Sequence, residues 1–231
     1  LLFLRLDRAS GEDRLLPRIP ISLRDRIGAA GTLNLCLSMA TMGMPTYGPL
    51  LMAMIHGTAP IVAGYILAIV SICWTVSALV LAGLPERHDP KTINAGFLLV
   101  VVSVVGMVWA VPHGPVWAIA FFAALEGFGF GAAWSFVIRR AKQLVEPDEL
   151  ERLSAALPTI GRLGYALGAA YCGIWANASG FALDNSPDEA AHVATVLFSA
   201  AVPIAFVALL AVFRFTSGPP ELEKTRPVRA G

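Results

Sequence analysis

The pattern of polar and apolar positions predicts a chain built from membrane-spanning helices. Residues 27–85 contain no Asp, Glu, Lys or Arg, and similar uncharged stretches recur through the rest of the chain. A helix of a water-soluble protein has a charged or polar face toward solvent, and these stretches have none. Crossing the hydrocarbon of a membrane takes about 20 mostly apolar residues, which each stretch provides. We therefore expect an all-α integral membrane protein.

Apolar length and the turn-forming residues between the stretches predict six spans. They are expected at about 28–54, 60–83, 92–112, 116–138, 154–177 and 191–213. Together they form a predicted six-helix bundle over 27–214. Residues 1–26 are predicted to hold the end of a preceding helix and a polar linker, in which Ser22 and Asp25 resemble a helix capping box. The proline- and charge-rich residues 215–231 predict a disordered tail.

The basic residues predict an orientation in the membrane. Every Lys and Arg except Arg162 lies before the first span, between the second and third, between the fourth and fifth, or after the sixth. The positive-inside rule places these segments, and both ends of the bundle, in the cytoplasm. The alternation also supports the number of spans, because a missed helix would mix the basic segments between the two sides. We expect the inner (cell) membrane of a bacterium.

Composition excludes several classes of protein. Charged residues make up 14% of the chain, whereas soluble domains have about a quarter. A net charge of +1 gives no sign of a nucleic-acid partner. The three cysteines have neither CxxC spacing nor a nearby histidine, so no metal site and no cofactor is predicted. The motifs HExxH, GxxxxGK[ST] and GxSxG do not occur, and we expect neither enzyme activity nor catalytic residues.

Two charged residues, Glu126 and Arg162, lie well inside predicted spans. At 1.5 Å per residue, each is roughly 15–20 Å from the basic end of its helix. A charge at this depth costs several kcal/mol unless it is paired or faces water, which makes both residues candidates for function. The fourth and fifth spans are antiparallel and joined by a short connection, so the two side chains could meet in mid-membrane.

Three interpretations of this pair remain open. In the functional one, Glu126 carries a proton or binds a cationic substrate, and Arg162 is its counter-ion. In the second, the two residues form a permanent ion pair that locks their helices together. In the third, Glu126 extends toward the outer interface of the membrane and has no partner.

Glycines are clustered on the same two spans. Gly127, Gly129 and Gly131 follow Glu126 in the run EGFGFGAAW, and Gly164 and Gly168 form a GxxxG pair. Such glycines allow a neighbouring helix to approach closely, and they also weaken a helix enough for it to bend. The pattern predicts either helix packing or a gate.

Further polar and aromatic residues could line a pathway through the bundle. Each has an ordinary alternative, since hydroxyl groups in membrane helices bond their own backbone and aromatic rings pack or anchor at an interface. The candidates are Asn34, Tyr47, Ser71, Trp74, Thr75, Trp134 and Tyr165.

Several segments between Thr46 and Gly180 resemble the C-terminal six-helix half of a major facilitator superfamily transporter. TYGPLLMAMIHGTAPIVAGYILAIVSICWTVSALVLAG is similar to helices seven and eight of that family, and is closest to the drug/proton antiporter branch. AGLPERHDPKTINAG resembles the loop between helices eight and nine. GFGFGAAW, RRAKQLVEPDELERLSAA and GRLGYALG resemble helices ten and eleven with their connection.

The resemblance implies a transporter of small molecules that works by alternating access, through proton-coupled export of drug-like or amphiphilic compounds. It implies a missing N-terminal six-helix half as partner, besides the lipid bilayer, protons and a small-molecule substrate. The first, second, fourth and fifth spans would face the cavity, and the third and sixth would face lipid. The alternatives are a metabolite carrier of the same fold and a six-helix membrane subunit that does not transport.

Overall fold

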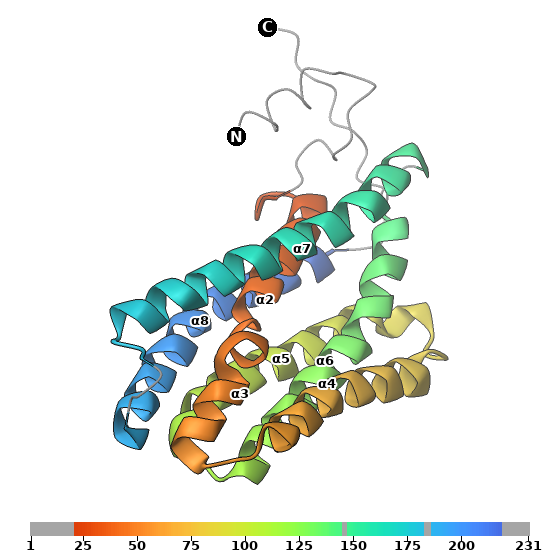
Figure 1. Ribbon diagram of the computed structural model, residues 1–231. Coiled ribbons are helices and arrows are strands. Elements are labelled where there is room, and N and C mark those ends of the chain that lie inside the picture. The colour runs from red at the N-terminus through yellow and green to blue at the C-terminus, as the bar shows by residue number, and fades with distance from the viewer. Residues whose placement is uncertain (1–20, 145–146, 183–185, 219–231) are drawn as a thin grey trace, which may run out of the picture.

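The computed structural model of the chain describes residues 21–144, 147–182 and 186–218, and within these ranges every element is helical (Figure 1). The elements are α2 (Arg26–Ala40), α3 (Gly43–His56), α4 (Pro60–Leu81), the short 3-10 helix η2 (Glu86–His88), α5 (Asp89–His113), α6 (Val116–Lys142), α7 (Pro147–Ala178) and α8 (Pro187–Thr216). The predicted all-α fold is confirmed. The predicted end of a preceding helix, the linker up to residue 20, and the tail from residue 219 lie outside the described residues.

Five helical segments of the described chain are long and apolar enough to cross a membrane. They are Arg26–His56, Pro60–Leu81, Glu86–His113, Val116–Lys142 and Pro187–Thr216. The sixth predicted span corresponds in order to α8, and the fifth to α7. Helix α7 has 32 residues, which is ample length, but Arg162 together with its glycines and tyrosines makes it less apolar than the other five.

The first predicted span, 28–54, is divided in the structure into α2 and α3. The amide of Thr41 still donates to the carbonyl of Leu37 at 3.1 Å, and the helix then stops. Pro45 explains the break, because it has no N–H to offer the carbonyl of Thr41 and its ring crowds that carbonyl. The span is therefore two short helices joined end to end.

The start of α2 differs from the predicted capping box. Asp25 itself is the N-cap residue, and its carboxylate accepts a hydrogen bond of 2.6 Å from the amide of Gly28. Ser22 accepts instead from the amide of Arg24, at 3.0 Å. The prediction identified the right place for a helix start but the wrong capping residue.

The helices form an open arc. Extensive contacts link neighbours in the order α4, α6, α5, α8, α2 and α7, while α3 continues α2 and touches α8, α4 and α7. Figure 1 shows the two ends of the arc, α4 and α7, on opposite sides of the bundle. Among the described residues α4 and α7 have no extensive contact with each other. The open side of the arc is consequently bordered by α4 and α7, with α6 and α2 behind them.

Glycines let α6 lie close to two neighbours at once. A Cβ atom at Gly127 or Gly131 would collide with the backbone carbonyl of Val70 or Trp74 on α4, and one at Gly129 would collide with the carbonyl of Gly96 on α5. The alternating glycines therefore face α4, α5 and α4 in turn. This places α6 between α4 and α5 with backbone against backbone.

The GxxxG pair of α7 is used in the same way against α2. A Cβ atom at Gly164 would lie 2.6 Å from the carbonyl oxygen of Leu35, and one at Gly168 would lie 2.6 Å from that of Met39. Both distances are too short for a real side chain. Helix α7 therefore contacts α2 along the face that carries these glycines.

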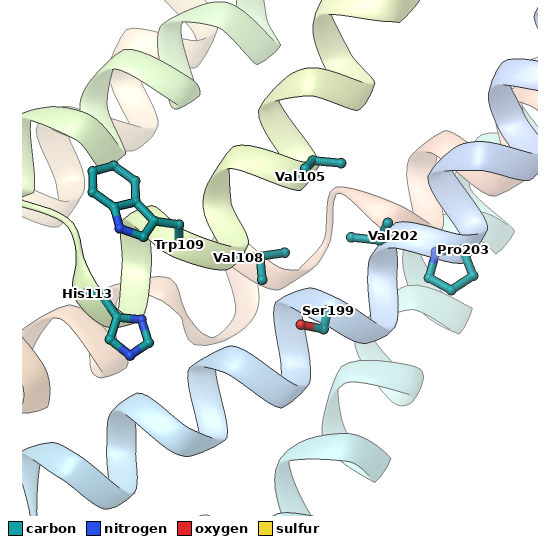
Figure 2. A pocket seen from close by; sticks show the side chains of 7 residues that line it. All are labelled: Val105, Val108, Trp109, His113, Ser199, Val202 and Pro203. Atoms are coloured by element: carbon teal, nitrogen blue, oxygen red, sulfur yellow. The ribbon is translucent and has the colours of Figure 1, made fainter.

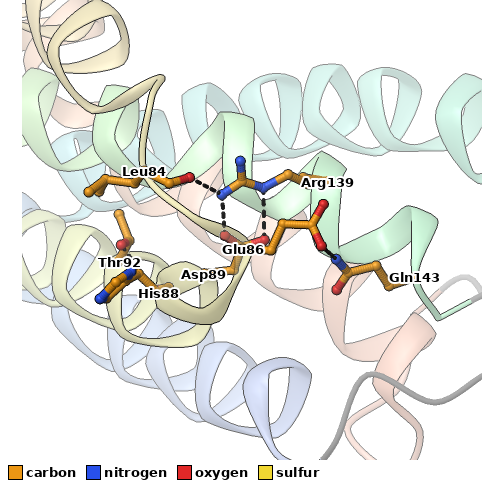
Figure 3. A network of polar contacts seen from close by, with 7 residues as sticks. All are labelled: Leu84, Glu86, His88, Asp89, Thr92, Arg139 and Gln143. Atoms are coloured by element: carbon orange, nitrogen blue, oxygen red, sulfur yellow. Dashed lines mark hydrogen bonds and ion pairs between the residues drawn. The ribbon is translucent and has the colours of Figure 1, made fainter.

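A polar network joins the α4–α5 connection to the basic end of α6 (Figure 3). Arg139 donates from Nε to Asp89 at 2.9 Å, forms a second, ion-paired bond to the same carboxylate, and donates to the carbonyl of Leu84 at 3.0 Å. Gln143 donates to Glu86 at 3.1 Å. The Asp89 side chain is buried, so its bidentate arginine supplies the hydrogen bonds that water cannot.

Arg140, the next residue, holds the end of α8. It is buried and donates to the carbonyls of Phe215, Thr216 and Gly218, at 3.5, 2.9 and 3.0 Å. The last carbonyls of a helix have no partner within the helix, and a cation near them is favourable. Adjacent arginines on α6 thus fasten two different parts of the chain.

Substitution of Gly127 by alanine is expected to destabilise the bundle. The added methyl group meets the backbone of α4, which cannot move without separating the two helices, and overpacking of this kind costs about 1–3 kcal/mol. Thermal unfolding of the full-length protein in detergent measures the effect. Gly64→Ala is the matched control, because a Cβ atom there meets nothing within 4 Å. Equal midpoints for the two variants would contradict the proposed packing.

Asp89→Asn is expected to lower stability because the buried bidentate pair with Arg139 is lost, at a cost of about 1–3 kcal/mol. Glu86→Gln, on the same connection, is the control: its carboxylate is exposed and bonds a neutral amide, so a change within about 0.5 kcal/mol is expected. The same unfolding measurement compares them. A larger loss for Glu86→Gln than for Asp89→Asn would show that the burial of Asp89 is not what matters.

Candidate functional site

Two cavities lie between the helices, one among α3, α4, α5 and α6 and the other among α2, α4, α6 and α7. The Glu126 cavity has a volume of about 210 Å³ and is lined by Met44, Pro45, Leu67, Val70, Ser71, Met107, Ala123 and Glu126. The Arg162 cavity has a volume of about 230 Å³ and is lined by Asn34, Ser38, Trp74, Phe130, Trp134, Pro158, Gly161, Arg162 and Tyr165. No lining residue is shared, so the two charged residues belong to separate cavities.

The cavities lie at neighbouring levels of the bundle. On α4, Ser71 lines the first and Trp74 the second; on α6, Glu126 lines the first and Phe130 the second. Four residues of helix correspond to a rise of about 6 Å. Because α6 runs toward its basic end, the Arg162 cavity lies closer to that end than the Glu126 cavity does.

Glu126 is buried in the middle of α6, with 9% of its surface exposed. The described residues give it no hydrogen bond and no ion pair. Its surroundings are the thioethers of Met44 and Met107 and the hydroxyl of Ser71. A carboxylate that is ionised here would lack the partner that offsets the loss of its hydration.

Arg162 is exposed toward the open side of the arc. It too has no hydrogen bond or ion pair to the described residues, and no Asp or Glu lines its cavity. Asn34 lines the same cavity, and its amide nitrogen Nδ2 donates to the carbonyl of Leu157 at 2.6 Å. This bond ties α2 to α7 next to Pro158. Pro158 is the first residue of α7 that lines the Arg162 cavity.

The structure does not bring Glu126 and Arg162 together as an ion pair. Their helices follow each other in sequence, but α6 packs between α4 and α5 while α7 packs on α2. A short connection between antiparallel helices suggested that the two would be neighbours, and the arc separates them. Each charge is thus left without a partner among the described residues.

Five of the seven predicted lining residues line one of the two cavities, and the other two lie elsewhere. Asn34, Trp74, Trp134 and Tyr165 all line the Arg162 cavity, and Ser71 lines the Glu126 cavity. Tyr47 lines neither; its ring packs edge-on against Phe181, with the ring centroids 5.4 Å apart. Thr75 donates to the carbonyl of Ser71 at 3.0 Å, the bond to its own helix that hydroxyl groups in membrane helices commonly make.

Phe130, Met44 and Met107 are among the cavity residues that were not singled out from the sequence. Phe130 lies one helical turn after Glu126, so helical spacing could have placed it on the same face. Met44 and Met107 carry no such signal, because a methionine in an apolar span is ordinary packing until its neighbours are known. The two methionines come from α3 and α5, and only the folded arc brings them to Glu126.

A larger and more open groove lies between α5 and α8, with a volume of about 590 Å³ (Figure 2). Val105 and Val108 line it from α5, and Ser199, Val202 and Pro203 line it from α8. Trp109 and His113 complete its lining, which includes no Asp, Glu, Lys or Arg and none of the predicted site residues. The groove therefore resembles a surface that faces hydrocarbon rather than a site for a polar ligand.

Among the described residues, no group of three or more His, Cys, Asp or Glu side chains is placed to hold a metal ion. The two cavities hold one carboxylate, one guanidinium, the hydroxyls of Ser38 and Ser71, the amide of Asn34, and aromatic and thioether groups.

Comparison with known proteins identifies relatives among transporters. The chain is 28% identical over 151 residues to a "Probable multidrug-efflux transporter" of Mycobacterium tuberculosis strain H37Rv and equally to its counterpart in strain CDC 1551; the match covers 63% of this chain and 32% of each relative. It is 26% identical over 124 residues to the riboflavin transporter RibZ of Clostridioides difficile, covering 53% of this chain and 27% of that protein. No solved structure shows a significant match.

The chain spans about a third of the length of the curated relatives it matches. The model of the Major Facilitator Superfamily matches residues 29–231, which is nearly the whole chain. The predicted resemblance is confirmed: this chain belongs to the Major Facilitator Superfamily.

Proposed function

We propose that the chain is the C-terminal half of a transporter that moves small molecules across a membrane by alternating access, and that it exports drug-like or amphiphilic compounds in exchange for protons. The family and the multidrug-efflux relatives support transport rather than catalysis. In this proposal the exposed sides of α4 and α7 pack against a second six-helix unit, with both ends of this half in the cytoplasm of a bacterial cell.

The proposed proton coupling is supported mainly by the surroundings of Glu126. It is a buried carboxylate, without a partner among the described residues, in the wall of a cavity lined mostly by apolar groups. When the cavity is closed to water, the neutral acid is the less costly form; when water enters, the carboxylate can be solvated. Opening and closing of the cavity would therefore load and release a proton at this residue.

Two arrangements expected from the sequence fit this proposal less well. A permanent ion pair would require the side chains of Glu126 and Arg162 to meet, and they line separate cavities. Extension of Glu126 to a membrane interface would require an exposed carboxylate, and this one is 9% exposed. We therefore propose that Glu126 acts within its own cavity.

Glu126→Gln is expected to abolish transport driven by a pH gradient while substrate exchange continues. The amide has the shape and hydrogen-bonding capacity of the neutral acid but cannot release a proton, so the gradient-driven rate should fall about tenfold or more. The measurement is uptake of a fluorescent efflux substrate into proteoliposomes of full-length protein, with and without an imposed gradient. Glu126→Asp, which keeps the proton, should recover part of the rate.

Glu86→Gln serves as the control for loss of a carboxylate, because Glu86 is exposed at the basic end and far from both cavities. If Glu126→Gln and Glu86→Gln transport alike at every pH, Glu126 does not carry the coupling proton. If the wild type exchanges a metabolite and no efflux substrate, the chain is a carrier of the same fold, as the similarity to a riboflavin transporter would favour. If it transports nothing, the proposal of a non-transporting membrane subunit replaces this one.

A further inference from the structure

The wall of the Arg162 cavity is unusually aromatic. Four of its lining residues are Trp74, Phe130, Trp134 and Tyr165, contributed by three helices. The rings of Trp74 and Phe130 are stacked, with centroids 5.3 Å apart and an angle of 8° between their planes. Phe130 is held in turn by the edge-on ring of Phe97, at 6.1 Å. The stack is therefore a fixed flat surface rather than a set of mobile side chains.

Phe130 belongs to the buried core and Trp74 packs against it, but the aromatic residues of the cavity are not all buried. Phe130 is 8% exposed and anchors the stack, whereas Trp74 and Trp134 are only partly buried and Tyr165 is 43% exposed. Packed aromatic cores bury their rings, and an aromatic face that is left open in a cavity is available to a planar ligand. The cavity thus offers ring surface on the α4, α6 and α7 sides.

Arg162 is the cavity's single charged residue. Its guanidinium has no hydrogen bond or ion pair to the described residues, and no Asp or Glu lines the cavity. A guanidinium presents parallel N–H groups whose spacing matches the two oxygens of a carboxylate or other oxyanion. In a span that crosses hydrocarbon, an unpaired cation is costly, and an anion brought by a ligand would offset that cost.

We propose that the Arg162 cavity binds a planar aromatic compound that carries a carboxylate or another oxyanion. The acid group pairs with Arg162, and the ring lies against the exposed faces of Trp74 and Trp134. The inference rests on the proposed transport function, because it names the class of substrate that the cavity would accept. Glu126, in a separate cavity one helical turn away, stays free to carry the proton and makes no contact with the ligand's acid group.

Binding of two matched probes tests the inference: 2-naphthoate, a planar aromatic acid, and 2-naphthamide, its neutral analogue. Affinities are measured by quenching of tryptophan fluorescence in full-length protein reconstituted in nanodiscs, without a pH gradient. We expect the wild type to bind the acid at least about tenfold more tightly than the amide, the factor that 1.4 kcal/mol of pairing would give. Arg162→Gln should abolish this preference, and Arg162→Lys should restore part of it.

Two further variants separate the charge from the ring surface. Trp134→Leu should weaken both probes alike, because it removes stacking and leaves the guanidinium. Arg152→Gln, on the same helix but outside the cavity, should leave both affinities unchanged. Retained binding of the amide by Arg162→Gln also serves as evidence that this variant is folded.

The inference is wrong if the wild type binds the two probes equally or binds neither, or if Arg162→Gln keeps the preference for the acid. In the last case Arg162 would be paired within the complete protein rather than with a ligand. These outcomes are distinguishable from failure of the proposed function. Binding is measured without transport, so an acid preference can persist when Glu126→Gln transports normally, and gradient-driven transport can persist when no acid preference exists.

Discussion

The free-energy cost of an unpaired charge in a membrane determines where charged residues can lie in this chain. Among the described residues, every Lys and Arg except Arg162 lies at one end of the bundle, where Arg139 and Arg140 bind the α4–α5 connection and the end of α8. Arg162 and the acidic Glu126 lie well inside their helices instead, and neither is neutralised by a described neighbour. Groups retained at such a cost need a compensating partner, and each of these two opens onto a cavity that could supply one. Function is therefore expected at these two residues.

Close packing by glycine explains why the cavities lie where they do. Gly127 and Gly131 let the backbone of α4 lie against α6. These contacts fix which residues of α6 lie at the same level as which residues of α4. Ser71 is thereby set at the level of Glu126, and Trp74 at the level of Phe130. The stacking of Trp74 on Phe130 follows directly from this register. The glycines are in this sense part of the site, although none of them presents a functional group to it.

The sequence predicted the positions of the helices better than it predicted which helices pack against one another. Long uncharged stretches locate the spans because hydrocarbon excludes charge, and this holds whatever packs against them. The break at Thr41 depends on one proline, Pro45, whose effect on a membrane helix ranges from a bend to a complete stop. The separation of Glu126 from Arg162 could not be predicted from sequence, since nothing local indicates that α6 prefers the faces of α4 and α5 to that of α7. Even so, four of the seven predicted lining residues meet in the Arg162 cavity, because polar and aromatic groups in apolar spans collect where lipid is absent.

The contact between Asn34 and Leu157 links this cavity to the shape of α7. Pro158 cannot donate to the preceding turn, so the backbone around it is the weakest part of the helix. The amide of Asn34 bonds to the carbonyl just before the proline, and Gly161, one turn later, leaves room for the same side chain. Helix α7 is thus held against α2 at its weak point, about one helical turn before Arg162. The bond therefore ties the backbone at Pro158 to α2, at the start of the stretch of α7 that lines the Arg162 cavity.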